Sequence, residues 1–323
     1  MAEDEGRPDG DPHPPPFVYD FAMPKRFPIP DDFRKRFCDV YGAIGAEWLA
    51  TLPERVALWQ ARLNVHGLQL VPGLSYNLVF FGRTGEGAPI VLKAAPEAGP
   101  LVSEAAALNA FGVARAAAVL TALPEEGLLL TERLQPGRRL AEVATEREAL
   151  DIVVGLFRAD WPAPERSLDD LATFTRSLER AAADPGSLDG DLLRAARAIL
   201  RSLLAEPGPV RVLHGDLHYD NILTDAAHGY RLIDPKGLCG DPGFDLGYLV
   251  SRTMPLGRDA LPLAQAVELR LQVLTESFAI ERGRLAAWAF VAAALSAAWT
   301  QEDHGDVSED ELQVLSQIAD ACG

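Results

Sequence analysis

Two short apolar segments, each followed by acidic or amide side chains, constrain the fold of this 323-residue chain more than any other feature. The first, residues 210–213, leads into the string His-Gly-Asp-Leu-His-Tyr-Asp-Asn, which contains Asp216 and Asn221. The second, residues 230–233, is followed directly by Asp234. Because a hairpin-like connection places such strands side by side, the pattern predicts that these three oxygen-bearing side chains lie together.

This set of side chains suits phosphoryl transfer from a nucleotide. A carboxylate such as Asp216 accepts the proton of an attacking hydroxyl, and the hard oxygens of Asn221 and Asp234 are the ligands that Mg²⁺ prefers. Protein kinases carry the same functions in H-R-D-x-x-x-x-N and D-F-G, with the same interval between Asp and Asn. For any one residue, a turn whose side chains cap the backbone is the alternative. The order of all three favours the catalytic interpretation.

A third apolar segment, residues 90–92, ends in Lys93. It is similar to the kinase V-A-I-K strand, whose ammonium contacts the α- and β-phosphates. Glu104 follows in a helix predicted to begin with Ser103 as its N-cap, and it is the natural partner for a lysine on a central strand. A solvated lysine and a first-turn glutamate are the alternative. The order of strand, helix and downstream catalytic block favours a nucleotide site.

The combined pattern resembles the aminoglycoside phosphotransferase superfamily, whose members share the protein-kinase-like fold. Residues 214–221, 234–237 and 240–247 carry this resemblance. The strings Ile-Asp-Pro-Lys-Gly, Leu-Leu-Leu-Thr-Glu-Arg-Leu and Trp-Thr-Gln-Glu-Asp narrow it to the streptomycin 6-kinase and hydroxyurea phosphotransferase branch. The similarity extends from residue 27 to the C-terminus.

The resemblance implies an α+β, bilobal protein-kinase-like fold. Residues 27–134 would form N-terminal helices and a small nucleotide-binding lobe with an antiparallel sheet, and residues 135–323 a larger, mainly helical lobe for catalysis and acceptor binding. Residues 1–26 are acidic and proline-rich and are expected to be a disordered tail. Apolar residues recur at helical spacing in several segments, which are residues 31–64, 140–161, 168–183, 192–204, 261–279, 281–299 and 308–321.

The resemblance also implies nucleotide contacts outside the catalytic block. A hairpin around residues 68–81 would cover the phosphates. Its turn has one glycine where protein kinases have G-x-G-x-x-G, so Ser75 and Asn77 are expected to supply hydrogen-bond donors, with an ordinary hairpin loop as the alternative. The hinge between the lobes would contact adenine through the backbone of Glu132 to Leu134.

Further residues are expected to support the catalytic loop, which is the segment of residues 214–221. In the family, an aspartate at the position of Asp245 accepts backbone hydrogen bonds from the loop, and the same role is expected here. His214 is expected to pack and hydrogen-bond beneath the loop rather than titrate. His218 and Lys236 lie close enough in sequence to face the phosphates, and their roles stay open.

The acceptor side is predicted from charge and from one helix end. The net charge of −17 and the pI near 4.8 argue against nucleic-acid and anionic-membrane partners, and they suit a cationic small molecule, although solubility alone would explain them. In the resembling branch, acidic residues of C-terminal helices line the acceptor site. Glu302 and Asp303 are therefore the expected acceptor contacts, and polar residues at a helix end are the alternative.

Three scattered cysteines without metal-ligand spacing, and a start that does not resemble a signal peptide, predict a cytoplasmic protein. The longest apolar run, residues 285–299, is shorter than the roughly 20 residues that a membrane span requires. A monomer or weak dimer is expected.

These observations predict an ATP- and Mg²⁺-dependent phosphotransferase that moves the γ-phosphate to a hydroxyl of a small molecule. An aminoglycoside such as streptomycin, at its 6-hydroxyl, is the first expectation. Hydroxyurea, choline, homoserine and a macrolide sugar are alternative acceptors. A catalytically silent kinase-like binding protein and a metal-dependent hydrolase are the alternatives from other classes.

Overall fold

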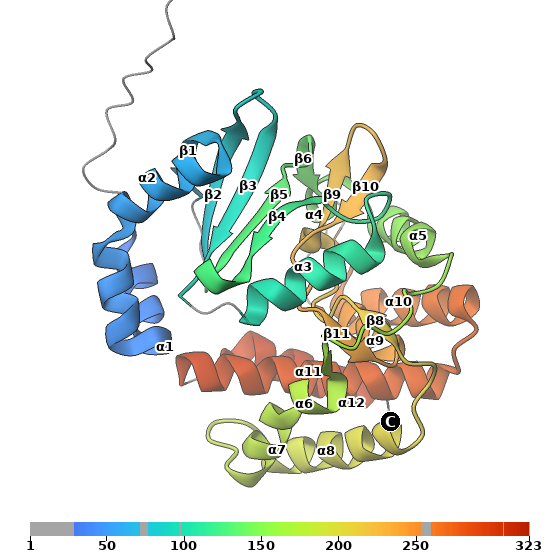
Figure 1. Cartoon of the computed structure of the whole chain (residues 1–323). Helices are drawn as coiled ribbons and strands as arrows, with labels where there is room; N and C mark the ends of the chain where they lie inside the picture. The colour runs from blue at the N-terminus through green and yellow to red at the C-terminus, as the bar shows by residue number, and fades with distance from the viewer. Residues whose placement is uncertain (1–28, 72–76, 97–98, 253–259, 306, 323) are drawn as a thin grey trace, which may run out of the picture.

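The chain folds into two lobes of unequal size with an antiparallel sheet in the smaller one and mainly helices in the larger (Figure 1). The α+β, bilobal fold expected from the sequence is confirmed. The computed structural model describes residues 29–71, 77–96, 99–252, 260–305 and 307–322. The expected disordered tail, residues 1–26, and Ser75 lie outside the described residues.

The small lobe is built on a five-stranded antiparallel sheet with the strand order β1-β2-β3-β5-β4. Two helices precede the sheet and a third connects its strands. The elements are α1 (Asp31–Ala50), α2 (Leu52–Leu63), β1 (Val65–Leu70), β2 (Leu78–Thr84), β3 (Pro89–Ala94), α3 (Gly99–Phe111), β4 (Val119–Leu123), the 3-10 helix η1 (Pro124–Glu126) and β5 (Leu128–Glu132).

Helices α1 and α2 pack on the outer face of this sheet through a chain of aromatic contacts. Phe37 contacts Trp48, Trp48 contacts Trp59, and Trp59 reaches Phe80 on β2, with ring centroids 5.6, 5.7 and 6.3 Å apart. All four side chains are buried. The N-terminal helices therefore form one hydrophobic core with the sheet, which is the supporting role expected of them.

Strand β3 orients Lys93 by simple alternation of its side chains. Ile90 and Leu92 point into the core shared with α1 and α2, whereas Val91 and Lys93 point to the opposite face and line a cavity. Successive side chains of a strand lie on opposite faces, so the apolar side chains of β3 that pack in this core determine where the ammonium points.

The large lobe contains two three-stranded sheets and a set of helices, with strand orders β10-β9-β6 and β7-β11-β8. Its elements are β6 (Pro136–Arg139), α4 (Leu140–Val143), α5 (Glu146–Phe157), β7 (Asp169–Asp170), α6 (Leu171–Phe174), α7 (Arg176–Ala183), α8 (Gly190–Ala205), β8 (Arg211–Leu213), the 3-10 helix η2 (Tyr219–Asn221), β9 (Ile222–Asp225), β10 (Gly229–Leu232), β11 (Leu238–Gly240), α9 (Gly243–Ser251), α10 (Leu263–Phe278), α11 (Arg282–His304) and α12 (Glu309–Cys322).

Helix α9 is buried along its whole length against α11, the long helix that runs across the lower part of Figure 1. The close approach depends on Gly243 and Gly247, because a Cβ atom at either position would collide with Trp288 of α11. This packing fixes the first turn of α9, which carries Asp245 toward the catalytic loop. Helix α3 contacts β4 and β5 as well as β8, and it therefore joins the two lobes.

Several helix boundaries differ from the sequence prediction, and the segment 168–183, expected to be one helix, begins with the short strand β7 and is divided between α6 and α7. Helix α3 begins at Gly99, so Ser103 lies inside the helix and is not its N-cap. The helix expected over residues 140–161 is interrupted before Glu146, where Thr145 and Glu148 form a capping box that starts a second helix. The T-x-x-E pattern that marks such a start is present in the sequence, but the continuous apolar periodicity concealed it.

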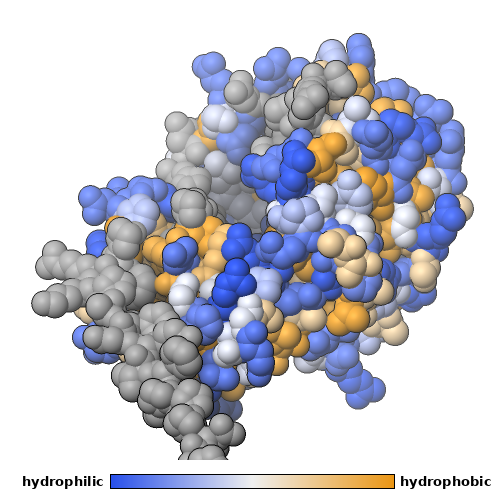
Figure 2. All heavy atoms as spheres, turned by 90° about the horizontal axis from the view of Figure 1, so that it is seen from above, coloured by the Kyte–Doolittle hydropathy of each residue, from blue (hydrophilic) through white to orange (hydrophobic). Residues whose placement is uncertain are grey.

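The surface seen in Figure 2 is mostly hydrophilic, and its apolar residues show as separate patches between polar side chains. No helix in the described part of the chain combines the length and the apolar character needed to span a bilayer.

Candidate active site

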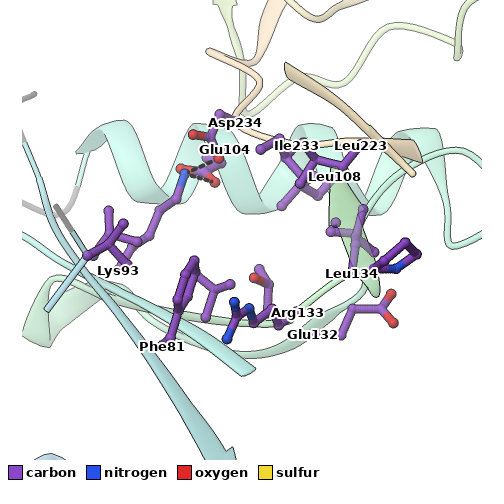
Figure 3. A pocket seen from close by; sticks show the side chains of 17 residues that line it. Phe81, Lys93, Glu104, Leu108, Glu132, Arg133, Leu134, Leu223, Ile233 and Asp234 are labelled. Atoms are coloured by element: carbon purple, nitrogen blue, oxygen red, sulfur yellow. Dashed lines mark hydrogen bonds and ion pairs between the residues drawn. The ribbon is translucent and has the colours of Figure 1, made fainter. Parts of the chain in front are cut away.

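A cavity of about 410 Å³ lies between the two lobes (Figure 3). Val79 and Val91 of the small-lobe sheet line one side, and Leu223 and Ile233 of the large lobe line the other. Apolar walls of this kind suit a planar ring system. The polar end of the cavity carries Lys93, Glu104 and Asp234.

The Lys93 ammonium joins the two lobes at this polar end. It donates to Glu104 of α3 at 2.7 Å and to Asp234, which follows β10, at 2.5 Å. Although burial opposes the charged form, the two carboxylates raise the pKa of Lys93, so the ammonium stays protonated. Burial likewise works against ionised Asp234, yet Lys93 lowers the pKa of that carboxyl. The structure therefore brings together the strand lysine and the helix glutamate expected to pair, and adds Asp234 to them.

Asp234 adopts a positive φ of 58°, which is uncommon for residues other than glycine. Such a backbone conformation persists only where the surroundings hold it, and it occurs preferentially at functional sites. Ile233 N–H donates to the carbonyl of Asn221, and Lys236 N–H donates to the carbonyl of His214. These bonds attach the Asp234 loop to the catalytic loop on both sides.

A buried carboxylate, Asp245, holds the start of the catalytic loop. It accepts the backbone N–H groups of His214 and Gly215, each at 2.8 Å, and the indole N–H of Trp161 at 3.0 Å. Burial raises the pKa of Asp245 to about 6 in spite of these three donors. The loop is thus fixed from beneath by a side chain that solvent does not reach.

His214 lies under the same loop and is completely buried. Its Nε2 lies 2.9 Å from the carbonyl oxygen of Ile233, and its Nδ1 accepts the N–H of Asp216 at 3.3 Å. Burial lowers the pKa of His214 to about 4, so the ring is neutral near pH 7. A neutral imidazole that donates through Nε2 and accepts through Nδ1 satisfies both contacts.

Asp216 and Asn221 lie at the two ends of the catalytic loop. Burial opposes the ionised form of Asp216, but Lys236 and His218 lower its pKa, so the carboxylate is charged at neutral pH. The amide nitrogen of Asn221 donates to the carbonyl of Asp216 at 3.0 Å and lies 3.1 Å from Nε2 of His218. With the nitrogen committed in this way, the amide oxygen of Asn221 is the atom left to bind a ligand.

The hinge residues Glu132, Arg133 and Leu134 line the cavity, and the first two have partners in the protein. The carboxylate of Glu132 accepts the N–H of Ala118 and the guanidinium of Arg231, at 2.7 and 2.6 Å. Arg133 N–H donates to the carbonyl of Pro89. Among the hydrogen bonds of the described residues, none uses the N–H of Leu134. Leu134 lines the cavity, so this N–H is a candidate donor to a ligand.

Four expected contacts lie away from this cavity or cannot be placed. Asn77 is half-buried and does not line the cavity. Glu302 forms a bidentate ion pair with Arg180 on the surface, at 2.8 and 3.0 Å. The side chain of Asp303 lies outside the described residues, as does Ser75.

A buried polar network that the sequence did not indicate supports the loop from the large lobe. Tyr219 of the catalytic loop donates to Glu146 at 2.7 Å, and Arg270 of α10 donates to both oxygens of Glu146, at 2.7 and 3.1 Å. Arg270 also donates to backbone carbonyls at the end of α9, including that of Val250. Arg270 occupies a position among the apolar residues that α10 buries. An arginine at such a position is the feature of the sequence that could have suggested a buried ion pair.

A kinase-like fold with a lysine that joins the two lobes and an apolar cavity between them is the architecture of a small-molecule phosphotransferase. Residues 65–304 match the family described as aminoglycoside/hydroxyurea antibiotic resistance kinases, and the chain belongs to this family. The resemblance seen in the sequence and the expected phosphotransferase activity are thereby confirmed.

Similar proteins agree with this assignment. The chain is 30% identical over 283 residues to streptomycin 6-kinase of Streptomyces griseus, which covers 85% of this chain and 91% of that protein. It is 33% identical over 285 residues to hydroxyurea phosphotransferase of Kitasatospora aureofaciens, covering 84% of this chain and 80% of that protein. The solved structure of choline kinase LicA from Streptococcus pneumoniae shares the fold, with a TM-score of 0.60, 15% identity and coverage of 83% of this chain and 99% of LicA.

Proposed function

We propose that the protein transfers the γ-phosphate of ATP, in the presence of Mg²⁺, to a hydroxyl of a cationic small molecule, with the 6-hydroxyl of streptomycin as the first candidate. The observation that carries this proposal is the cross-lobe contact of Lys93 with Glu104 and Asp234 beside a loop that presents Asp216 and Asn221. A positioned ammonium, a base and two hard oxygen donors are the parts that phosphoryl transfer requires.

The nucleotide would occupy the interlobe cavity. Adenine would lie between the apolar walls and accept the free N–H of Leu134, and the carbonyl of Glu132 is proposed as its second backbone partner. The Lys93 ammonium would then meet the α- and β-phosphates at the polar end. Asn77 and Ser75 remain proposed contacts of the phosphates from the hairpin turn.

The donor set fits Mg²⁺. The amide oxygen of Asn221 and the second carboxylate oxygen of Asp234 have no protein partner among the hydrogen bonds of the described residues, and both are hard ligands. The described residues contain no group of three or more His, Cys, Asp or Glu side chains that would hold a cation alone, which agrees with a site completed by phosphate oxygens. When bound, Mg²⁺ would neutralise phosphate charge and orient the phosphates.

The chain's own groups would perform the proton step. Asp216, ionised at neutral pH, would orient the acceptor hydroxyl and take its proton as the new O–P bond forms. Asp245 and His214 keep the loop in place during this step. The lowered pKa makes Asp216 a weak base, so orientation of the hydroxyl is its main contribution.

Streptomycin is preferred as the acceptor because the streptomycin 6-kinase of Streptomyces griseus matches most of this chain and because the net charge of −17 favours a cation. Hydroxyurea is the second candidate, from the Kitasatospora relative. Glu302 and Asp303 remain proposed acceptor contacts. A guanidinium of the acceptor would have to displace Arg180 from Glu302, so Glu302→Gln should raise the acceptor KM and leave the ATP KM unchanged.

The test is ATP consumption with Mg²⁺ in the presence of streptomycin, hydroxyurea, other aminoglycosides or choline, beside Asp216→Ala. We expect turnover with streptomycin, phosphorylated streptomycin as the product, and loss of turnover with unchanged ADP affinity in the variant. Turnover only with hydroxyurea or choline would refute streptomycin as the acceptor, and the proposed phosphotransferase activity would stand. Full turnover by Asp216→Ala would refute the role of this carboxylate.

A further inference from the structure

Lys236 lies between the base and the polar end of the nucleotide cavity. It stands on the loop that joins β10 to β11, two residues after Asp234. Its ammonium is 4.0 Å from a carboxylate oxygen of Asp216 and also acts electrostatically on Asp234 and Glu104. With Lys93, these groups form a row of alternating charges from α3 to the catalytic loop.

The backbone of Lys236 is held firmly, while its side chain is free to adapt. Its N–H donates to the carbonyl of His214 at 2.7 Å, and His214 is itself held by Asp245. The next residue, Gly237, has a φ of 69° and packs so closely on the carbonyl of Ser103 that a Cβ atom would collide with it. The lysine side chain is half-exposed, and among the hydrogen bonds of the described residues none uses its ammonium, whose ion pair with Asp216 is long at 4.0 Å. The loop therefore supplies a positioned cation that can still approach an anionic ligand.

Other cationic or imidazole groups around the base already have protein partners. Lys93 is engaged by two carboxylates, and Arg252 donates to the hydroxyl of Tyr248 at 3.4 Å. His218 contacts the amide of Asn221. Of the groups that approach Asp216 in the described part of the chain, Lys236 is thus the one best able to accept an anionic ligand.

The reaction places an anion at this position. The acceptor oxygen, oriented by Asp216, forms a bond to the γ-phosphorus while the bond from that phosphorus to the β,γ-bridging oxygen breaks. The electron pair of the broken bond leaves with ADP, and the hydroxyl proton passes to Asp216. The transferred group carries negative charge on its oxygens throughout, and carboxylates lie on both sides of its path. A preorganised cation at this point lowers the barrier more than the same charge in water would.

We propose that Lys236 is a catalytic residue whose ammonium contacts the transferred phosphoryl group and stabilises its charge in the transition state. The assignment rests on the proposed function, because it requires ATP in the interlobe cavity. The Lys236 contact requires a γ-phosphate. It would therefore form with ATP and with analogues that keep this group, and it would not form with ADP.

Binding of two nucleotides to Lys236→Met tests the assignment without knowledge of the acceptor. Calorimetry would compare Mg²⁺-ADP with Mg²⁺-AMP-PNP, which retains a γ-phosphate. We expect the AMP-PNP affinity to fall about tenfold, as for loss of one charge-assisted contact, while the ADP affinity stays at the wild-type value. Turnover with streptomycin should fall on the order of 10²-fold, and Lys236→Arg should restore part of it. Lys35→Met, which removes an exposed lysine of α1, is the matched control and should behave as wild type.

The outcomes separate this inference from the function on which it rests. Equal weakening of ADP and AMP-PNP in Lys236→Met would mean that the lysine supports the site as a whole and would overturn the inference. Unchanged affinity for both nucleotides would overturn it as well. If the wild-type protein bound neither nucleotide, the proposed function would fall together with it, and that result is distinct from the other two.

Discussion

Replacement of Asp245 by asparagine tests how the catalytic loop is held, and its magnitude follows from the structure. The carboxyl is fully buried, and burial raises its pKa from the ordinary 3.8 to about 6. The folded state therefore keeps a proton that the unfolded chain has already released, so stability falls as the pH rises through this window. At about 1.36 kcal/mol per pKa unit the full loss is about 3 kcal/mol, of which about 2 kcal/mol falls between roughly pH 4.5 and 7.5.

Asp245→Asn removes this titration and one hydrogen-bond acceptor. The amide has a single oxygen for the donors on His214, Gly215 and Trp161, so a buried N–H loses its partner at a cost of about 1–3 kcal/mol. The variant should be less stable than wild type at low pH. This gap, the difference in the free energy of unfolding between the two proteins, should narrow by about 2 kcal/mol between pH 4.5 and 7.5. Because the loop start is loosened, kcat should also fall.

Urea unfolding at a series of pH values, followed by the fluorescence of the five tryptophans, measures the gap directly. Trp161→Phe is the companion variant. It removes a donor that lowers the pKa of Asp245, so the loss of stability should move to higher pH. A gap that widens with rising pH would refute the reasoning, since it would mean that the three N–H donors outweigh burial and depress the pKa.

Three further substitutions have definite expected outcomes. Arg270→Met leaves the buried Glu146 without its counter-ion, so urea unfolding should show a loss of about 3–5 kcal/mol, and the double variant with Glu146→Met should recover part of it; no recovery would contradict the pairing. Lys93→Met removes the cross-lobe ammonium, and calorimetry should show ADP affinity reduced about tenfold or more, whereas unchanged affinity would exclude a phosphate contact. Gly237→Ala forces a Cβ against the carbonyl of Ser103 at a positive φ, so kcat should fall more than ADP affinity; wild-type turnover would show that this loop tolerates displacement.

Much of the candidate site was predictable because its parts are close together in the chain. The catalytic loop begins directly after β8 and ends at η2, and β9 and β10 are paired strands joined by a short turn, so Asp216, Asn221 and Asp234 have little freedom to separate. The alternation of β3 likewise predicts that Lys93 and Val91 share a face. Local connectivity and side-chain periodicity can both be predicted from the sequence without knowledge of the tertiary structure.

The long-range partners of the hinge side chains are not predictable from residue order. The sequence predicts a strand and then a turn near Glu132, and it also suggests that backbone groups make the contacts. It does not predict that Arg231 of β10 pairs with the Glu132 carboxylate. The sequence likewise does not predict the ion pair of Glu302, because its partner Arg180 lies 122 residues away in the chain.

The sequence by itself thus determined the order of the elements, the proximity of Asp216, Asn221 and Asp234, and the face of β3 that carries Lys93. Tertiary structure alone decided the long-range pairs: Lys93 with Asp234, Trp161 with Asp245, and Glu146 with Arg270, which lie 141, 84 and 124 residues apart. The reason is that periodicity records which side of a helix or strand is buried, whereas the identity of a buried polar partner depends on how separate elements pack. Each of these pairs forms only because the packing of the lobes and helices brings its members together, and the pairs of Trp161 with Asp245 and of Glu146 with Arg270 are also buried.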